Sequence, residues 1–232
     1  EVLGEFPSAD DDTIIPMELA RAAVDREVSL SASAPIVWGV DVARFGGDNS
    51  ALCVRQGNTV LEMKTFNSMD LMQLCGAIKN KYDNETVMTK PQEILVDVIG
   101  LGSGVVDRLS EQNLPVRGVN VAESPSTKKN FLNLRAELWF AIKDWLAQRD
   151  CRLPDDDELV AELVAPIYKY TSTGKIKIES KEEMKKRGIK SPDRADALAL
   201  TMASSAASFS GSQSFMGYNF KKPLKSRILR VG

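Results

Sequence analysis

Apolar runs interrupted by glycine and acidic residues dominate the first half of the chain. The segment 36–57, IVWGVDVARFGGDNSALCVRQG, predicts an apolar strand, a glycine-containing connection and a second apolar strand. Residues 58–66, NTVLEMKTF, alternate well enough to predict a third strand, joined to the second through Gly57-Asn58. The pattern therefore predicts three consecutive antiparallel strands.

Helical and strand patterns alternate after this region. Apolar residues at helical spacing predict helices that begin near Ser68, Phe131 and Pro192. Residues 93–98, EILVDV, predict a short strand, and a glycine-rich turn, a helix and a strand over 115–121 follow it. This order is typical of a βαβ unit with parallel strands, so we expect an α/β fold.

Composition limits where and how the protein works. The chain has 232 residues, of which 43% are apolar, which suits one α/β domain with a sizeable core. Its 30 basic and 32 acidic residues give a net charge of −2, so a site for a polyanion has to be local. We find no apolar run long enough to cross a membrane and no secretory leader, and therefore expect a protein of the cell interior.

The absence of histidine restricts the possible chemistry. It excludes Ser-His-Asp and Cys-His catalysis, imidazole general bases and the usual zinc enzyme site. The three cysteines are far apart and outside any CxxC spacing, which argues against disulfides, structural zinc and redox pairs. Carboxylates without imidazole suit a hard cation such as Mg²⁺ or Mn²⁺.

Three aspartates occupy comparable positions in this pattern. Asp41 ends the first predicted strand, Asp97 ends the glycine-flanked strand, and Asp196 lies on an alanine-rich helix face three residues after Asp193. Such carboxylates can converge on one point, where two divalent ions about 3.5–4 Å apart would activate a water and stabilise the leaving oxygen of a phosphodiester. This suggests a ribonuclease H-like fold. Asp193 competes with Asp196 for the third role, and Asp41 and Asp48 could instead accept backbone N–H bonds in a turn.

Three stretches carry a resemblance to a known family. GVDVARFGGDNSALCV, ILVDVIGLGSGVVDRL and IESKEEMKKRGIKSPDRADALAL resemble, in that order, the nuclease-domain motifs of the large terminase subunit of tailed bacteriophages. The resemblance implies a Mg²⁺- or Mn²⁺-dependent endonuclease in the host cell cytoplasm that cuts concatemeric viral double-stranded DNA. It implies portal protein and the small terminase subunit as partners. It also implies that the metal-binding carboxylates are Asp41, Asp97 and Asp196, with Asp48 accessory and Asp193 as the alternative third ligand.

The same resemblance predicts how the chain is divided. The GEFP stretch near the start is similar to the segment that joins the ATPase motor to the nuclease in that family. No GxxxxGK[ST] phosphate cradle is present, so we expect the nuclease half without its ATPase domain. Residues 1–34 would be a connector with a helix from about residue 17 to 28, residues 35–208 the ribonuclease H-like domain, and residues 209–232 a basic, mobile tail.

A local basic stretch lies between the second and third motifs. Residues 168–178, YKYTSTGKIKI, alternate around a Ser-Thr-Gly turn and predict a β-hairpin, and a short helix follows. From residue 169 to 190 there are eight basic residues and three acidic ones. We predict that the basic ones hold DNA phosphates without reading bases, and the alternative is an ordinary solvated surface. They are Lys169, Lys175, Lys177, Lys181, Lys185, Lys186, Arg187 and Lys190.

Other functions compete with the nuclease. The first motif also resembles the first phosphate loop of actin-like sugar kinases and Hsp70-type ATPases, but GLGSG after Asp97 supplies at best half of the second loop they need. A dinucleotide fingerprint fails because Val105 breaks the G-x-G-x-x-G spacing. In a further alternative, the aspartates are unrelated turn and cap residues of a module that docks DNA or portal. Metal binding separates that module from the nuclease.

Overall fold

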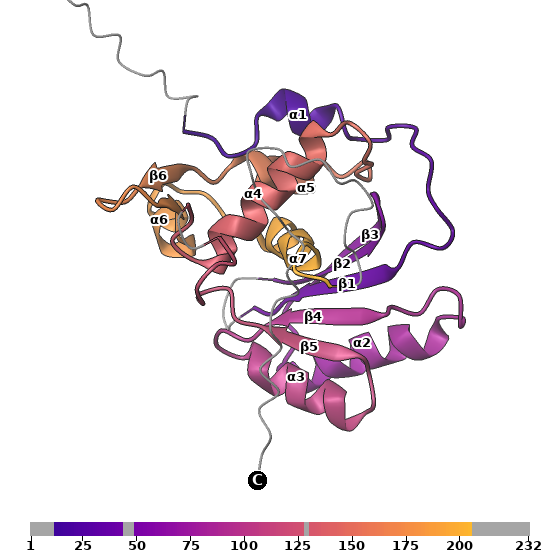
Figure 1. The fold of residues 1–232 in the computed structure, drawn as a ribbon. Helices are drawn as coiled ribbons and strands as arrows, with labels where there is room; N and C mark the ends of the chain where they lie inside the picture. The colour runs from indigo at the N-terminus through magenta and orange to yellow at the C-terminus, as the bar shows by residue number, and fades with distance from the viewer. Residues whose placement is uncertain (1–11, 44–48, 128–129, 206–232) are drawn as a thin grey trace, which may run out of the picture.

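A five-stranded mixed sheet forms the centre of the structure, a computed structural model that describes residues 12–43, 49–127 and 130–205 (Figure 1). The strand order is β3-β2-β1-β4-β5. Strands β1, β2 and β3 are antiparallel, as predicted, whereas β1, β4 and β5 run parallel. The strands are β1 (Ile36–Asp41), β2 (Ser50–Gln56), β3 (Thr59–Phe66), β4 (Glu93–Asp97) and β5 (Val116–Val119). The predicted ribonuclease H-like mixed sheet is confirmed.

Helices cover both faces of this sheet and create two apolar cores (Figure 1). Strand β1 serves both cores because successive strand residues point to opposite faces. Val37 belongs to the core on one side, and Trp38 and Val40 belong to the core on the other. One face carries α2 (Leu71–Asn84) and α3 (Gly102–Glu111), and the other carries α1 (Met17–Arg21), α4 (Leu134–Ala147), α5 (Asp157–Val164) and α7 (Asp193–Thr201).

Helix α7 packs directly against the backbone of β1 at Gly39. A Cβ atom on Gly39 would lie 2.1 Å from the carbonyl oxygen of Ala197 and 2.9 Å from Cγ2 of Thr201, so no larger residue fits without moving the helix. Asp41 is two residues further along the strand and so lies on the same face as Gly39. The glycine therefore lets the helix that carries Asp196 approach the strand that carries Asp41.

Side chains from neighbouring elements hold both ends of α7. At the N-terminal end, Glu162 on α5 accepts hydrogen bonds from the backbone N–H groups of Arg194 and Ala195, at 2.7 and 3.1 Å. At the C-terminal end, the buried Arg55 of β2 donates to the hydroxyl and the carbonyl oxygen of Thr201, both at 2.8 Å. These contacts satisfy helix-end groups that have no partner within the helix.

The predicted hairpin is present, and its second strand packs beside α4 (Figure 1). It consists of β6 (Tyr168–Tyr170) and β7 (Ile176–Ile178). The short helix α6 (Lys181–Lys186) follows, and Ser180 and Glu183 form a capping box at its start.

The N-terminal helix is shorter than predicted. It ends at Arg21 because Val24 forms a β-bridge with Leu153 and the φ of Asp25 is +48°. The predicted connector 1–34 is described only from residue 12, and the predicted tail 209–232 lies outside the described residues. No helix of the described ranges is long and apolar enough to cross a membrane.

Candidate active site

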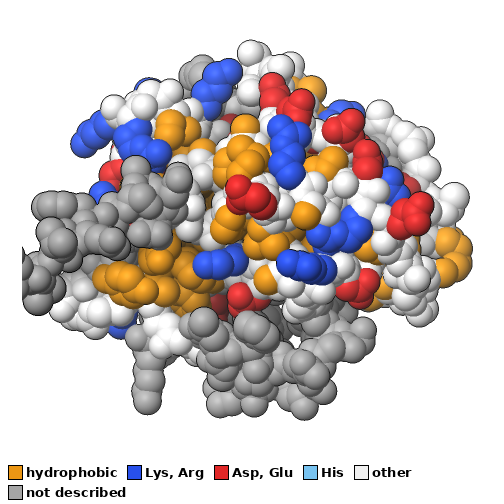
Figure 2. Space-filling view, turned by 90° about the horizontal axis from the view of Figure 1, so that it is seen from above, with side chains coloured by type: hydrophobic (Ala, Val, Ile, Leu, Met, Phe, Trp, Pro, Cys, Tyr) orange, Lys and Arg blue, Asp and Glu red, His pale blue; other side chains and the backbone are white. Residues whose placement is uncertain are grey.

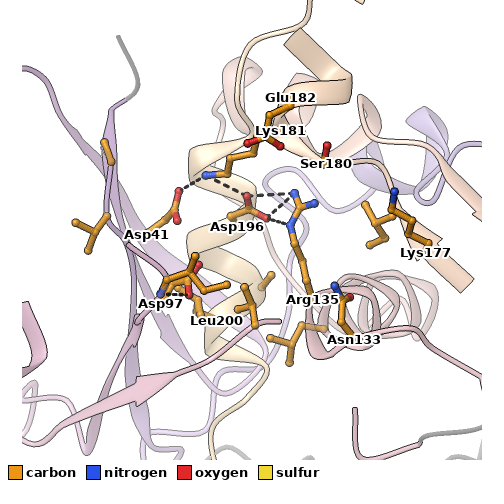
Figure 3. Close-up of a pocket in the computed structure, with 17 residues that line it drawn as sticks. Asp41, Asp97, Asn133, Arg135, Lys177, Ser180, Lys181, Glu182, Asp196 and Leu200 are labelled. Carbon is orange, nitrogen blue, oxygen red and sulfur yellow. Dashed lines mark hydrogen bonds and ion pairs between the residues drawn. The ribbon is translucent and has the colours of Figure 1, made fainter. Parts of the chain in front are cut away.

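Asp41, Asp97 and Asp196 line the same pocket, which has a volume of about 320 Å³ (Figure 3). Asp41 is the last residue of β1 and Asp97 the last residue of β4, and these strands are parallel neighbours, so both carboxylates lie at one edge of the sheet. Asp196 reaches the pocket from the first turn of α7. The structure therefore brings together the three predicted carboxylates from three separate segments.

The ammonium group of Lys181 lies among these carboxylates. Its Nζ atom is 2.9 Å from Oδ2 of Asp41 and 3.4 Å from Oδ2 of Asp196 (Figure 3). It is also 3.2 Å from Oδ1 of Asp193. Among the described residues, no three carboxylate or thiol side chains are arranged so as to hold a metal ion. The carboxylates instead converge on a cation that the chain itself supplies.

Asp193 and Asp196 differ in what they face. Asp193 accepts hydrogen bonds from the hydroxyl of Ser191 and from the backbone N–H of Asn49, the latter at 3.2 Å, and it does not line the pocket. Asp196 does line it. This placement favours Asp196 as the third carboxylate, although both residues contact Lys181. The accessory candidate Asp48 lies outside the described residues.

Burial and neighbouring charges act differently on the three carboxyl groups. Burial raises the pKa of Asp41 to about 7, although the charge of Lys181 opposes this and the nearby aspartates add to it. Burial also raises the pKa of Asp97, against a hydrogen bond from the N–H of Ile99. For Asp196, burial is outweighed by Arg135, Lys181 and the indole of Trp139, so its pKa is lowered. Asp196 is therefore the most firmly ionised of the three.

The rest of the pocket wall is basic, polar and apolar. Arg135 and Asn133 come from the start of α4, and Lys177 and Ser180 come from β7 and the segment after it (Figure 3). Apolar side chains complete the lining, among them Val121, Leu138, Ile178 and Leu200. The pocket thus carries carboxylates on one wall and nitrogen donors opposite them, an arrangement suited to a cation and an anion held side by side.

Comparison with known proteins identifies the fold. No protein-family model and no curated protein sequence matches the chain. Solved structures do match. The K428A mutant nuclease domain of the large terminase subunit gp2 of bacterial virus Sf6, with manganese and beta-thujaplicinol, superposes with a TM-score of 0.66 and 23% identity, over 82% of this chain and 97% of that one. The large terminase nuclease from thermophilic phage G20c gives a TM-score of 0.62 and 13% identity, over 83% and 98%.

The chain has the fold of a large terminase nuclease domain. Further solved structures with this fold contain bound metal: the same Sf6 mutant with manganese and the G20c nuclease with magnesium, at TM-scores of 0.62 and 0.59. The predicted resemblance to these domains is confirmed at the level of the fold, and the roles of individual residues remain predictions.

The predicted DNA-binding residues of this terminase-nuclease fold are not equivalent. Lys177 lines the pocket and Lys181 lies among the carboxylates. Arg187 pairs with Glu179. The remaining members are exposed or partly exposed on the hairpin and around α6: Lys169, Lys175, Lys185, Lys186 and Lys190. Lys181 thus differs from the surface lysine expected from sequence, and the phosphate-binding role of the whole set stays a prediction.

Charges of both signs are mixed elsewhere on the surface. Figure 2, which looks down on the molecule from above the view of Figure 1, shows Lys and Arg side chains interspersed with Asp and Glu. This agrees with the net charge of −2, which predicted that any site for a polyanion would be local.

The two side chains of α4 that contact Asp196, Arg135 and Trp139, were not among the predicted site residues. Both contact the carboxylate of Asp196. Trp139 was expected in the core and is indeed fully buried. A signal for Arg135 did exist, because it lies four residues before Trp139 and seven before Ile142, on the apolar face of the helix. A charged residue on such a face needs a partner of opposite charge.

Proposed function

We propose that the chain is a divalent-metal-dependent endonuclease that hydrolyses phosphodiester bonds of double-stranded viral DNA during genome packaging. The single observation that carries this proposal is that Asp41, Asp97 and Asp196 line one pocket within a terminase-nuclease fold. Either feature alone is compatible with other functions, because one fold can support many activities.

The donor chemistry of the pocket residues suits a hard divalent cation. All three candidate ligands are carboxylates, the donor type that Mg²⁺ and Mn²⁺ prefer. Two of them, Asp41 and Asp196, already lie within 3.4 Å of one positive group, the ammonium of Lys181. When bound, two divalent ions would activate a water molecule and stabilise the leaving oxygen of the phosphodiester. Lys181 would then share its carboxylates with the ions.

The wall opposite the carboxylates would receive the DNA backbone. Lys177 of β7 lines the pocket at the edge away from Asp41 and Asp97 (Figure 3), and its Nζ atom is 3.5 Å from Glu183 in a long, half-exposed ion pair. Lys169 and Lys175 extend the basic charge along the hairpin. Contacts from lysine to phosphate carry no sequence information, which suits an enzyme that cuts many sequences.

The biological setting of the proposal comes from the resemblance. It includes host cell cytoplasm, portal protein, the small terminase subunit and an ATPase domain of the same polypeptide. It also includes a division into a connector over 1–34, a nuclease domain over 35–208 and a basic tail over 209–232. These partners and boundaries stay predictions for this chain.

Cleavage of supercoiled plasmid tests the proposal. We expect nicking and linearisation with Mg²⁺ or Mn²⁺, none in excess EDTA, and no requirement for ATP. Asp41→Asn, purified in parallel, should be inactive and so excludes a contaminating nuclease. Asp107→Asn, on the exposed surface of α3, is the matched control and should cut like the parent. Cutting that continues in EDTA, or an active Asp41→Asn protein, contradicts the metal mechanism.

A further inference from the structure

The two carboxylate oxygens of Asp196 share a hydrogen bond from Nη2 of Arg135 and differ in their other partners. Oδ1 accepts a hydrogen bond from the indole Nε1 of Trp139 at 2.8 Å and from Nη2 and Nε of Arg135 at 3.1 and 3.2 Å. Oδ2 lies 3.3 Å from Nη2 of Arg135 and 3.4 Å from Nζ of Lys181 (Figure 3). Three N–H groups of α4 therefore converge on Oδ1, whereas Oδ2 is the oxygen that faces Lys181 and the other carboxylates.

Arg135 is held in place by a second contact. Its Nη1 donates to the backbone carbonyl oxygen of Glu179 at 2.8 Å, two residues before Lys181. The guanidinium also lies 5.8 Å from the centre of the Trp139 ring, and its side chain is only 15% exposed. All three nitrogens of the guanidinium thus have protein acceptors. Arg135 is therefore better suited to hold another residue than to bind a phosphate, although it lines the pocket.

We propose that Arg135 and Trp139 are positioning residues that fix Asp196 as a one-oxygen ligand, with Oδ1 bound to α4 and Oδ2 directed at the cation site. This inference rests on the proposed function, because it assigns a metal-facing role to Oδ2. A carboxylate free to rotate would lose conformational entropy on binding the ion, and hydrogen bonds to its other oxygen remove that freedom in advance. Groups that orient a metal ligand in this way typically change affinity by about 10–100-fold.

A pair of tryptophans on α4 allows a matched test. Trp139 and Trp145 are both buried on this helix, at 0% and 1% exposure. Trp139 donates to Asp196, whereas Nε1 of Trp145 has no hydrogen-bond partner in the described structure. Substitution by Phe removes the indole N–H at both positions. It reduces the side-chain volume by the same amount at each, and it leaves the charge of the site unchanged. A difference between Trp139→Phe and Trp145→Phe therefore reports the hydrogen bond and not the packing.

The experiment measures Mn²⁺ affinity by calorimetry in the absence of DNA. We expect Trp139→Phe to raise the Kd for Mn²⁺ by about 10-fold or more, and Trp145→Phe to leave it within about 2-fold of the parent. Arg135→Lys keeps the positive charge but loses the planar guanidinium that donates several hydrogen bonds at once, so it should also raise the Kd for Mn²⁺. This variant keeps the test decisive if Trp139→Phe does not fold, as judged by circular dichroism.

The possible results separate this inference from the proposed function. Equal Kd values for Trp139→Phe, Trp145→Phe and the parent would overturn the positioning role while leaving the nuclease intact. A parent that binds no Mn²⁺ would overturn both. As a second readout, Trp139→Phe should lower the cleavage rate at saturating DNA without changing metal-free affinity for DNA, which a general loss of folding would not do.

Discussion

Lys181 and Asp41 form an ion pair of 2.9 Å between helix α6 and the end of strand β1. They are 140 residues apart in the sequence. The same ammonium also contacts Asp193 and Asp196, so one positive charge lies among three buried carboxylates. Without a metal ion, Lys181 therefore limits the repulsion that the candidate ligands would otherwise exert on one another.

Lys181→Met should destabilise the metal-free protein and increase the stabilisation that added metal gives. The variant keeps the length of the side chain but leaves the carboxylates without their cation, at a cost of about 1–3 kcal/mol in the free energy of unfolding. In thermal denaturation with EDTA we expect a lower Tm, and a larger rise on addition of Mn²⁺ than in the parent. Lys79→Met, which removes a surface ion pair with Asp83, should cost less than about 1 kcal/mol. Equal Tm values for the two variants would contradict this role.

Asp196→Asn and Asp193→Asn should have different effects on cleavage. Asp196 lines the pocket, whereas Asp193 faces Ser191 and the backbone of Asn49. Asp196→Asn should therefore reduce the rate by at least about 100-fold, as expected for loss of a direct ligand, and Asp193→Asn by much less. Rates on a plasmid at fixed Mn²⁺ decide this. The reverse order would make Asp193 the third ligand.

Lys175 and Lys177 should contribute to DNA affinity without sequence preference. Replacing both by Ala in an Asp41→Asn background should lower affinity for every duplex alike and reduce the log–log salt slope by up to about 0.9 for each lost phosphate contact. The control replaces Lys79 and Lys90 by Ala. Lys79 belongs to α2 and Lys90 lies 4.6 Å from the ring of Tyr82 on that helix, which covers the opposite face of the sheet (Figure 1). A slope that changes only in the control would place the DNA on that other face.

Glu162→Gln should change how stability depends on pH. Burial raises the pKa of Glu162 from its ordinary value of 4.5 to about 8, against hydrogen bonds from the N–H groups of Ala195 and Arg194. Between these values the folded protein keeps a proton that the unfolded chain has released. The contribution of this raised pKa to the free energy of unfolding is therefore complete below about pH 4.5 and is lost as the pH rises through about 8.

The glutamine side chain cannot titrate, so the stability of the Glu162→Gln variant should not fall with pH for this reason. Its amide oxygen can still accept hydrogen bonds from the same two N–H groups. Urea unfolding in EDTA at about pH 5, 6.5 and 8 should show the parent losing stability relative to Glu162→Gln as the pH rises. Parallel curves for the two proteins would show that Glu162 is ionised throughout this range.

Gly39→Ala should damage the fold and the site together. The added Cβ would lie 2.1 Å from the carbonyl oxygen of Ala197, so α7 has to move away from β1, at a cost of about 1–3 kcal/mol. The displacement separates Asp196 from Asp41, and cleavage should fall even in the fraction that stays folded. Gly76→Ala is the control because nothing lies within 4 Å of its added Cβ in α2, where it should stabilise the helix by about 0.4–1 kcal/mol. Urea unfolding and plasmid cleavage measure the two effects.

Sequence reasoning succeeded where a short pattern determines local structure. The antiparallel order of the first three strands followed from alternation and the Gly57-Asn58 turn. The positions of Asp41 and Asp97 near strand ends followed from apolar runs that lead into an acidic residue and then a glycine-containing connection. Parallel strands place such ends at one edge of the sheet, which is why convergence of the aspartates could be predicted.

The remaining features depend on how distant elements pack. The sequence predicts a short helix after the hairpin, but the contact of Lys181 with Asp41 depends on where α6 lies relative to the sheet. The early end of α1 depends on the bridge between Val24 and Leu153, a contact between segments far apart in the chain. Trp139 matches a core pattern and is buried, and nothing in that pattern reveals that its indole N–H reaches Asp196.

The close packing of α7 on Gly39 also determines when, during synthesis on the ribosome, the protein can become active. Strand β1 is made before α7, which ends at Thr201 and is the last described helix to emerge. Until then the face of β1 that carries Asp41 lacks the helix that covers it, and the pocket lacks Asp196 and the other side chains that α7 supplies. A nascent chain that lacks α7 therefore holds no assembled pocket, and the proposed cleavage activity would begin only after α7 has packed on β1.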